Sequence, residues 1–211
     1  MMEVYINARF LTQDITGVQR FAIELCKELQ KAIPNLHFVA PKNIIHTDIA
    51  QQFQVKTFGR FNSHWWEQIE LPLFLRKKGK PLLINLCNTA PMNYKNQVAV
   101  IHDVAFLVNP AWFSKKFSKI YSFLIPKIIR RARKVVTVSE FSKTEIKRLV
   151  SVDDTKIDVV YNGISHMYNI PTISGKGNEY GKYLLTVSSI NPRKNFRNLI
   201  LAFNHLKLPD I

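Results

Sequence analysis

A run of four apolar residues, Val98-Ala99-Val100-Ile101, leads directly into His102 and Asp103. Both faces of such a strand are apolar, which is typical of a parallel sheet that helices cover on both sides. Open parallel sheets bind their ligands at the carboxyl ends of the strands. The run therefore predicts an α/β fold in which His102 and Asp103 lie at the edge of the sheet where a ligand would bind.

Strands and helices are expected to alternate along residues 1–163, which is the pattern of a parallel sheet. We expect strands at 2–7, 36–40, 82–86, 98–101, 134–138 and 157–160, short β-like pieces at 44–45 and 54–58, and helices that begin at residues 17, 64, 113 and 140. Pro72 and Pro126 are expected to bend the second and third of these helices. The fold class that follows is α/β, with a Rossmann-like doubly wound parallel sheet.

Residues 164–181 predict a linker, because prolines and glycines replace the periodic apolar pattern there. After it we expect a strand at 183–187, a polar loop at 188–195 and a helix at 196–206. One strand and one helix do not bury their own apolar surface. We therefore divide the chain into a domain of residues 1–163, a linker, and residues 182–211 as the first strand–helix unit of a truncated second domain.

The formal net charge of +15 is concentrated in one interval of the chain. Thirteen Lys and Arg residues and one acidic residue, Asp103, lie between Leu71 and Ser139, which leaves a formal charge of +12 there. Nucleic acid, an anionic membrane surface and a phosphorylated ligand are partners that suit this charge. A solvated basic face without a partner is the alternative.

The sequence also predicts a location in the cell. No apolar run reaches the ~18 residues of a membrane-spanning helix, and the first residues lack the basic region of a signal peptide. Cys26 and Cys87 are far apart and without metal-type spacing, which favours a reducing compartment. We expect a cytoplasmic protein that attaches peripherally to the inner face of the cytoplasmic membrane through its basic interval.

His102 and Asp103 are the first candidates for chemistry. A neutral imidazole at His102 can hydrogen-bond a ligand hydroxyl, and the Asp103 carboxylate can orient the ring or the ligand. The alternative is a satisfied, partly buried histidine without a ligand.

Two further candidates lie at predicted helix starts. Gly17 would offer free backbone N–H groups to an anion or to sugar hydroxyls, with Arg20 in the same first turn, although a simple cap is the more common role for such a glycine. Arg193 and Lys194 follow a predicted strand and precede a helix, a position that suits a diphosphate; a solvated basic pair is the alternative. We expect no metal and no cofactor, because the sequence has no Cys/His cluster with zinc spacing.

Six segments, each weak alone, form an ordered set that resembles a known family. The chain is similar to the N-terminal half of the family 4 retaining glycosyltransferases, the GT-B enzymes of polysaccharide and O-antigen assembly. The resemblance rests on Thr16-Gly17-Val18-Gln19-Arg20-Phe21, Trp66-Glu67-Gln68 with Leu71-Pro72, Val100-Ile101-His102-Asp103, Val136-Thr137-Val138-Ser139-Glu140-Phe141-Ser142, Val159-Val160-Tyr161-Asn162-Gly163-Ile164 and Asn191-Pro192-Arg193-Lys194-Asn195.

The resemblance implies a cleft between an acceptor-binding domain and a domain that binds a nucleotide-sugar. His102 would be the catalytic contact to the transferred sugar, and Asp103 and Ser139 would help to orient the site. Gly17 and Arg20 would lie near the donor phosphate and the acceptor. Arg193 and Lys194 would neutralise the departing diphosphate, so that no metal is required.

The expected activity is transfer of a hexose, such as mannose, with retention, from a nucleotide-sugar to a lipid-linked or polysaccharide acceptor of the cell surface. The family's Glu-x7-Glu motif is absent before Ile211. The alternative is therefore a catalytically incomplete half-enzyme that binds the acceptor or an anionic membrane and works with a partner chain that supplies the missing domain. A nucleic-acid-binding domain ranks last, since no motif for it is present.

Overall fold

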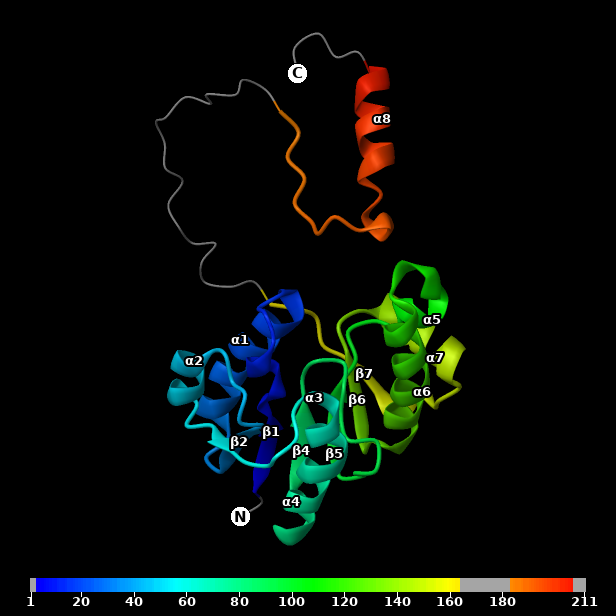
Figure 1. Ribbon diagram of the computed structural model, residues 1–211. Helices are drawn as coiled ribbons and strands as arrows, with labels where there is room; N and C mark the ends of the chain where they lie inside the picture. The colour runs from blue at the N-terminus through cyan, green and yellow to red at the C-terminus, as the bar shows by residue number, and fades with distance from the viewer. Residues whose placement is uncertain (1–2, 164–182, 207–211) are drawn as a thin grey trace.

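The computed structural model describes residues 3–163 and 183–206 (Figure 1). Its centre is a seven-stranded, all-parallel sheet with the strand order β3-β2-β1-β4-β5-β6-β7. The order reverses beside β1, as it does in doubly wound sheets. The strands are β1 (Val4–Asn7), β2 (Leu36–Ala40), β3 (Lys56–Thr57), β4 (Leu82–Asn85), β5 (Gln97–Val100), β6 (Lys134–Thr137) and β7 (Ile157–Val159).

Helical segments connect these strands. They are η1 (Ala8–Thr12), α1 (Gly17–Ala32), α2 (Thr47–Gln52), α3 (Ser63–Trp65), η2 (Trp66–Glu70), α4 (Leu71–Lys77), α5 (Ala105–Val108), η3 (Pro110–Trp112), α6 (Lys115–Arg131), α7 (Glu140–Val150), η4 (Asp154–Lys156), η6 (Pro192–Lys194) and α8 (Phe196–Leu206). The predicted Rossmann-like α/β class is confirmed. The part of the chain that the structure describes contains no helix long and apolar enough to cross a membrane.

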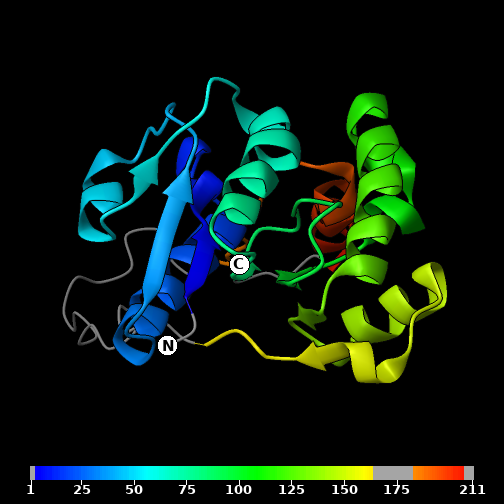
Figure 2. The same ribbon diagram turned by 90° about the horizontal axis from the view of Figure 1, so that it is seen from below.

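Alternate residues of each strand point to opposite faces of the sheet, and each face has its own helices. Ile6, Phe38 and Val100 belong to a core formed with α1. Their neighbours Tyr5 and Val39 pack against η2 and α4, and on the same side of the sheet α6 and α7 cover β5, β6 and β7. Figure 2 shows α4 and α6 together on this side. Helices on both faces explain why the strands carry apolar residues in continuous runs.

The apolar run Val98-Ala99-Val100-Ile101 forms the buried strand that the sequence predicts. Ala99 and Val100 lie in β5 and Ile101 follows it, and all three are at most 4% exposed. The Ile101 N–H still donates to the Val136 carbonyl, at 2.8 Å. His102 and Asp103 therefore leave the sheet at its carboxyl edge.

Neither Pro72 nor Pro126 interrupts its helix. Residues 63–77 are continuously helical through α3, η2 and α4, and η2 is a π-helical segment directly before Pro72. A π-helical turn accommodates irregular hydrogen bonding, and Pro72 then falls in the first turn of α4, where a missing N–H costs little. Pro126 lies inside α6, which runs unbroken from Lys115 to Arg131.

Three further segments differ from the sequence expectations. Of the β-like pieces expected at 44–45 and 54–58, only the two-residue edge strand β3 is formed, within the second piece. Helix α2 was not predicted. The strand expected at 183–187 is not formed, and its side chains are exposed. A parallel strand requires a neighbouring strand for its hydrogen bonds, and residues 183–187 have none among the described residues. The helix expected after it is confirmed as α8, whereas the predicted linker at 164–181 lies outside the described residues.

Candidate functional site at the carboxyl edge of the sheet

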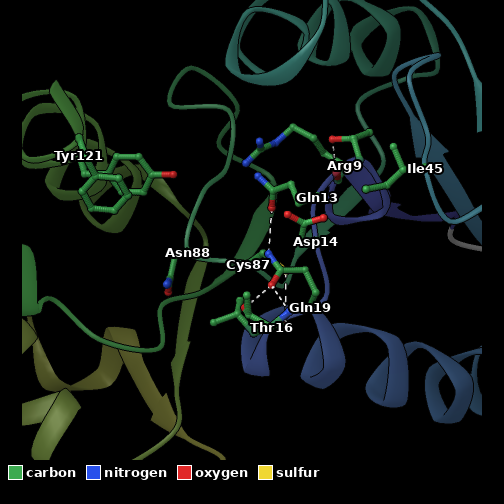
Figure 3. Close-up of a pocket in the computed structure, with 12 residues that line it drawn as sticks. Arg9, Gln13, Asp14, Thr16, Gln19, Ile45, Cys87, Asn88 and Tyr121 are labelled. Carbon is green, nitrogen blue, oxygen red and sulfur yellow. Dashed lines mark hydrogen bonds between the residues drawn. The ribbon is translucent and has the colours of Figure 1, made fainter. Parts of the chain in front are cut away.

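A polar hollow of about 500 Å³ opens at the carboxyl edge of the sheet (Figure 3). Arg9 comes from η1, directly after β1, and Asn88 from the loop after β4. Tyr121 and Phe117 come from α6, on the opposite side. The remaining lining residues are Thr12, Gln13, Asp14, Thr16, Val18, Gln19, Ile45 and Cys87. The hollow thus lies where parallel sheets place their ligands.

The start of α1 forms one wall of the hollow and is fixed by its own side chains. The Thr16 N–H donates to Gln19 Oε1 at 3.2 Å, and Gln19 Nε2 donates to Gln13 Oε1 at 2.9 Å. Thr16 and Gln19 together form a capping box, which satisfies backbone groups that a helix N-terminus leaves without partners. These hydrogen bonds hold the start of α1 in its conformation without a ligand.

A buried ion pair supports the floor of the hollow. Arg9 Nε lies 3.1 Å from Glu67 Oε1, and the two side chains are 5% and 1% exposed. Glu67 Oε1 also accepts hydrogen bonds from Asn7 Nδ2 at 2.8 Å and Thr89 Oγ1 at 3.1 Å. Arg9 Nη2 lies 2.6 Å from the same Thr89 oxygen. Burial alone would raise the pKa of Glu67, but the Arg9 charge, His64 and Asn7 lower it to about 2.

An aromatic wall faces Arg9 across the hollow, as Figure 3 shows for Tyr121. The rings of Phe117 and Tyr121 are stacked, with centroids 3.9 Å apart and 17° between their planes. Tyr121 Oη lies 3.5 Å from His64 Nε2, and His64 Nδ1 lies 3.5 Å from Glu67 Oε2. The ion pair and the aromatic wall are therefore connected through His64.

His102 lies beside the hollow and does not line it. Its ring Nε2 is 3.0 Å from the Leu86 carbonyl, so Nε2 carries the proton and donates, and Nδ1 is the ring atom that remains for a ligand. The ring packs edge-on against Phe21, with centroids 4.8 Å apart. Burial lowers the pKa of His102, although the Leu86 carbonyl and Asp103 oppose this shift. The predicted neutral imidazole agrees with this environment.

Asn88 links His102 to the hollow. Its side-chain Oδ1 accepts the His102 backbone N–H at 2.6 Å, and its own N–H donates to the Val100 carbonyl at 3.2 Å. Asn88 also lines the hollow and has a left-handed backbone with φ of 60°. The position of His102 therefore depends on a residue that an occupant of the hollow would touch.

Asp103 and Arg193 lie close together in the structure. Arg193 Nη1 lies 3.7 Å from Asp103 Oδ2, and both side chains remain accessible, at 36% and 51%. Asp103 Oδ1 accepts the Ala105 N–H at 3.0 Å and so orients the turn into α5. Lys194 is exposed next to Arg193 in η6.

Ser139, Gly17 and Arg20 occupy structural or solvent-exposed positions. Ser139 caps α7 by accepting the Ser142 N–H, and Ser142 Oγ in turn donates to the His102 carbonyl at 2.9 Å. Gly17 begins α1, and a Cβ added there would meet no atom within 4 Å. Arg20 is exposed, and neither Gly17 nor Arg20 lines the hollow. Their roles toward a ligand stay predictions.

The sequence patterns missed Arg9, Asn88 and Tyr121 as site residues. The position of Arg9 directly after β1, at the carboxyl edge of the sheet, could have indicated a site residue. Glu67 lies in one of the segments that carry the family resemblance. Tyr121 gives no separate signal, because the apolar residues of the helix expected from residue 113 recur at ordinary helical spacing. They are Phe113, Phe117, Ile120, Tyr121, Leu124 and Ile128. Among residues 3–163 and 183–206, no three His, Cys, Asp or Glu side chains are grouped as metal ligands would be.

These features define a class of protein: a Rossmann-like α/β domain with a polar, aromatic-walled hollow at its ligand-binding edge. Residues 15–167 match the model of Glycosyltransferase Family 4, which covers more than half of the chain. The chain therefore belongs to Glycosyltransferase Family 4.

Two curated relatives are O-antigen chain mannosyltransferases. The chain is 28% identical over 138 residues to O-antigen chain mannosyltransferase RfbU of Salmonella typhimurium, which covers 65% of this chain and 36% of the relative. It is 22% identical over 240 aligned positions to O-antigen chain mannosyltransferase B of Escherichia coli, which covers 98% of this chain and 61% of the relative. The chain thus spans between about a third and three fifths of the length of these relatives.

The fold also resembles that of a solved structure. Anabaena Alr3699/HepE in complex with UDP superposes with a TM-score of 0.53 at 14% sequence identity, over 78% of this chain and 44% of that one. Its complex with UDP-glucose gives a TM-score of 0.51. At this identity the likeness supports the fold alone.

Proposed function

We propose that the protein is a retaining glycosyltransferase of cell-surface polysaccharide synthesis, in which residues 1–163 bind the acceptor. It would transfer a hexose, with mannose as our first candidate, from a nucleotide-sugar to a lipid-linked or polysaccharide acceptor. Family membership and the names of the two curated relatives support the reaction class and the choice of mannose. HepE, whose fold this chain resembles, was solved in complex with UDP, and a nucleotide-sugar is the donor that we propose for this chain.

The observation that carries this proposal is the grouping of a polar hollow, His102 and the Asp103–Arg193 pair at one edge of the sheet. The hollow offers an acceptor site. His102, neutral and with Nδ1 available, would hydrogen-bond a hydroxyl of the transferred sugar. Asp103 and Ser139 act as positioning residues, since they fix the turns that adjoin His102.

Departure of a nucleoside diphosphate places negative charge where the glycosidic bond breaks. Arg193 and Lys194 would stabilise that charge, a type of interaction worth about 3 kcal/mol per donor in comparable sites. With two cations in this role the reaction would require no metal. Gly17 and Arg20 would lie at the outer end of the site, toward the donor phosphate.

The alternative is a catalytically incomplete half-enzyme that binds the acceptor or an anionic membrane and acts with a partner chain. A specific feature of α6 favours membrane contact. Its side chains Ile120 and Phe123 are 39% and 57% exposed, and Lys127 Nζ lies 3.5 Å above the Phe123 ring. Lys115, Lys116 and Lys119 are exposed on the same helix. Exposed aromatic residues among lysines are typical of helices that lie on anionic lipid.

The test is to incubate the 211-residue chain with radiolabelled GDP-mannose or UDP-glucose and a bacterial lipid-linked glycan extract, with and without EDTA. We expect transfer by the chain, or by the chain together with a domain that supplies a nucleotide-sugar site, and an anomeric configuration equal to that of the donor sugar. Turnover by the chain alone would exclude the half-enzyme. Absence of transfer from every donor in both forms would contradict the proposed function.

A further inference from the structure

We propose that the edge of the sheet at which the strands begin is a docking surface for an acidic segment of a partner protein. This edge lies opposite to the carboxyl edge and its hollow. The surface, called the amino-edge surface below, consists of six exposed basic side chains: Lys78, Lys80, Lys95, Arg130, Arg131 and Arg133.

The parallel topology gathers these residues from three separate parts of the chain. Residues 78–80 lie between α4 and β4, Lys95 precedes β5, and residues 130–133 join the end of α6 to β6. These three strands are neighbours and run parallel, so their first residues lie at the same edge. In Figure 1 this edge is the lower end of the sheet, where α4 ends.

The fold therefore divides the basic interval of the sequence between two opposite edges. Lys115, Lys116 and Lys119 belong to the first turns of α6. Phe117, in the same turns, lines the hollow, so these lysines lie toward the carboxyl edge. The last residues of α6 belong to the amino-edge surface, at the other end of the helix.

Hydrogen bonds between the loops hold the basic residues next to one another. Asn96 Nδ2 donates to the Lys80 carbonyl at 3.0 Å, which joins the loop before β5 to the loop before β4. Arg131 donates through Nη1 to the side chain of Asn93, which joins the end of α6 to the loop before β5. The surface is thus a fixed arrangement of charges.

No carboxylate neutralises the amino-edge surface. Elsewhere on the molecule cations pair with acidic residues of their own helix, for example Lys27 with Glu24 at 2.9 Å in α1. Within residues 3–163 and 183–206, the six side chains of the amino-edge surface form no ion pair, although the adjacent Lys134 pairs with Asp158. Like charges that are held together repel each other, and an anionic partner removes this repulsion.

The chemistry of the surface suits carboxylates. Half of its charges are guanidinium groups, those of Arg130, Arg131 and Arg133. A guanidinium group binds a carboxylate through two parallel N–H donors, which gives geometric specificity as well as attraction. A protein segment rich in Asp and Glu would therefore satisfy the surface.

Lipid suits the amino-edge surface less well. Segments 76–81, 92–97 and 130–134 contain none of the large apolar side chains that are exposed in the described residues, whereas a surface that inserts into lipid presents such side chains. A lipid-linked acceptor would also place the bilayer at the carboxyl edge, from which the amino-edge surface faces away. This second step rests on the proposed function.

Single-stranded nucleic acid would find no stacking platform. Tyr94 is the aromatic residue of the three segments, and it is 3% exposed. Its hydroxyl donates to the Pro81 carbonyl, which directs the ring inward. Bases of single strands bind by stacking on exposed aromatic rings, so an acidic protein segment is the partner that the surface favours.

The test measures binding of a fluorescent peptide of alternating Glu and Gly residues to the 211-residue chain by fluorescence anisotropy. We expect micromolar affinity that falls at least tenfold when the salt concentration rises from about 0.05 M to about 0.3 M, because salt screens the charges. Substitution of Lys80, Lys95 and Arg133 by Glu should weaken the binding at least tenfold. Substitution of the same residues by Gln should weaken it at least threefold.

The fold should tolerate these substitutions. The three side chains are exposed and make no hydrogen bond to the described residues. Circular dichroism and thermal unfolding check this. The matched control replaces Lys115, Lys116 and Lys119 by Glu, which changes the net charge by the same amount near the opposite edge. The control should leave peptide binding within twofold.

Four results would overturn the inference. The first is an equal loss of peptide binding in the amino-edge variant and the control, because binding would then follow net charge alone. The second is no binding of the peptide at low salt. The third and fourth are phosphatidylglycerol vesicles or duplex DNA that bind more tightly than the peptide and lose this binding in the amino-edge variant. Peptide binding requires no sugar transfer, so failure of this inference and failure of the proposed function are distinguishable.

Discussion

Arg9 Nε lies 3.1 Å from Glu67 Oε1, although 57 residues separate the two in the chain and both side chains are almost completely buried. Breaking one partner of such a pair leaves an unpaired charge in the core, which typically costs about 3–5 kcal/mol. We therefore expect Glu67→Gln to lower the free energy of unfolding by about 3 kcal/mol.

Denaturant unfolding followed by circular dichroism measures this change. Glu24→Gln is the matched control, because it removes a carboxylate from the half-exposed pair with Lys27 and should cost less than about 1 kcal/mol. Equal losses in the two variants would show that the buried pair has no special role.

The same carboxylate predicts how stability depends on pH. Glu67 has a pKa of about 2 in the folded chain, below the ordinary value of about 4.3 in an unfolded chain. The unfolded state therefore binds a proton first as the pH falls, so the contribution of Glu67 is complete above about pH 5 and declines between there and pH 2. Unfolding at pH 6, 4 and 3 should show a steeper loss for the native chain than for Glu67→Gln. Parallel curves would contradict the assignment.

Glycine substitutions separate backbone strain from steric overlap. Gly59 has φ of 94°, and a Cβ there would overlap the Glu70 carboxylate and Trp66, whereas Gly79 has φ of 82° and open space around it. We expect Gly59→Ala to destabilise by about 2–4 kcal/mol, Gly79→Ala by about 1 kcal/mol, and Gly17→Ala by almost nothing. Thermal unfolding of the three variants tests the order, and a Gly79→Ala variant as unstable as Gly59→Ala would contradict the overlap.

His102 is expected to contribute to transfer, and the His102→Ala variant is expected to remain folded although it loses the hydrogen bond to the Leu86 carbonyl. In whichever form of the protein turns over, His102→Ala should lower kcat about 100-fold or more, since it removes one hydrogen bond to the reacting sugar. Burial lowers the pKa of His102, so the neutral form persists below the ordinary value of about 6.5, and activity should fall only at more acidic pH. The pH profile of kcat measures this, and a fall that begins above pH 7 would contradict it.

The basic face of α6 predicts binding to anionic lipid. Replacing Lys115, Lys116 and Lys119 by Glu should reduce co-sedimentation with phosphatidylglycerol vesicles at least tenfold and leave the fold intact, because acidic residues suit a helix N-terminus better than basic ones. Substitution of Lys42, Lys56 and Arg60 by Glu gives the same charge change away from α6 and should have a smaller effect. Equal binding to neutral and anionic vesicles would exclude this role.

The sequence predicts the sheet well because its signals are local. A buried parallel strand appears in the sequence as a run of apolar residues. The run that precedes His102 predicts both the strand and the position of His102 at the carboxyl edge of the sheet. The edge strand β3 has only two residues, too few for a periodic pattern, so neither it nor α2 was predicted. Residues 183–187 have the composition of a strand, yet a strand forms only where another strand supplies its hydrogen bonds.

The site was less predictable than the fold, because its contacts join residues that are far apart in the chain. His102 and Asp103 could be placed at the carboxyl edge of the sheet, since a position after a buried strand is readable from the chain, whereas the strand from which Arg193 was placed is not formed. The pairing of Arg9 with Glu67 joins the end of β1 to a helix that follows β3, and no short-range pattern reports it. Tyr121 carries no separate signal, because aromatic residues at helical spacing look the same in the sequence whether they pack into the core or line a hollow.

Asn88 combines a left-handed backbone, a hydrogen bond to the His102 N–H and a place in the wall of the hollow. Glycine tolerates this backbone but has no side chain to accept the bond, and most other residues that could accept it resist the conformation. Position 88 is therefore open to very few amino acids, chiefly Asn and Asp. In a library of random variants selected for transfer, this residue should show far less sequence diversity than its exposed neighbours, although it makes no contribution to the hydrophobic core.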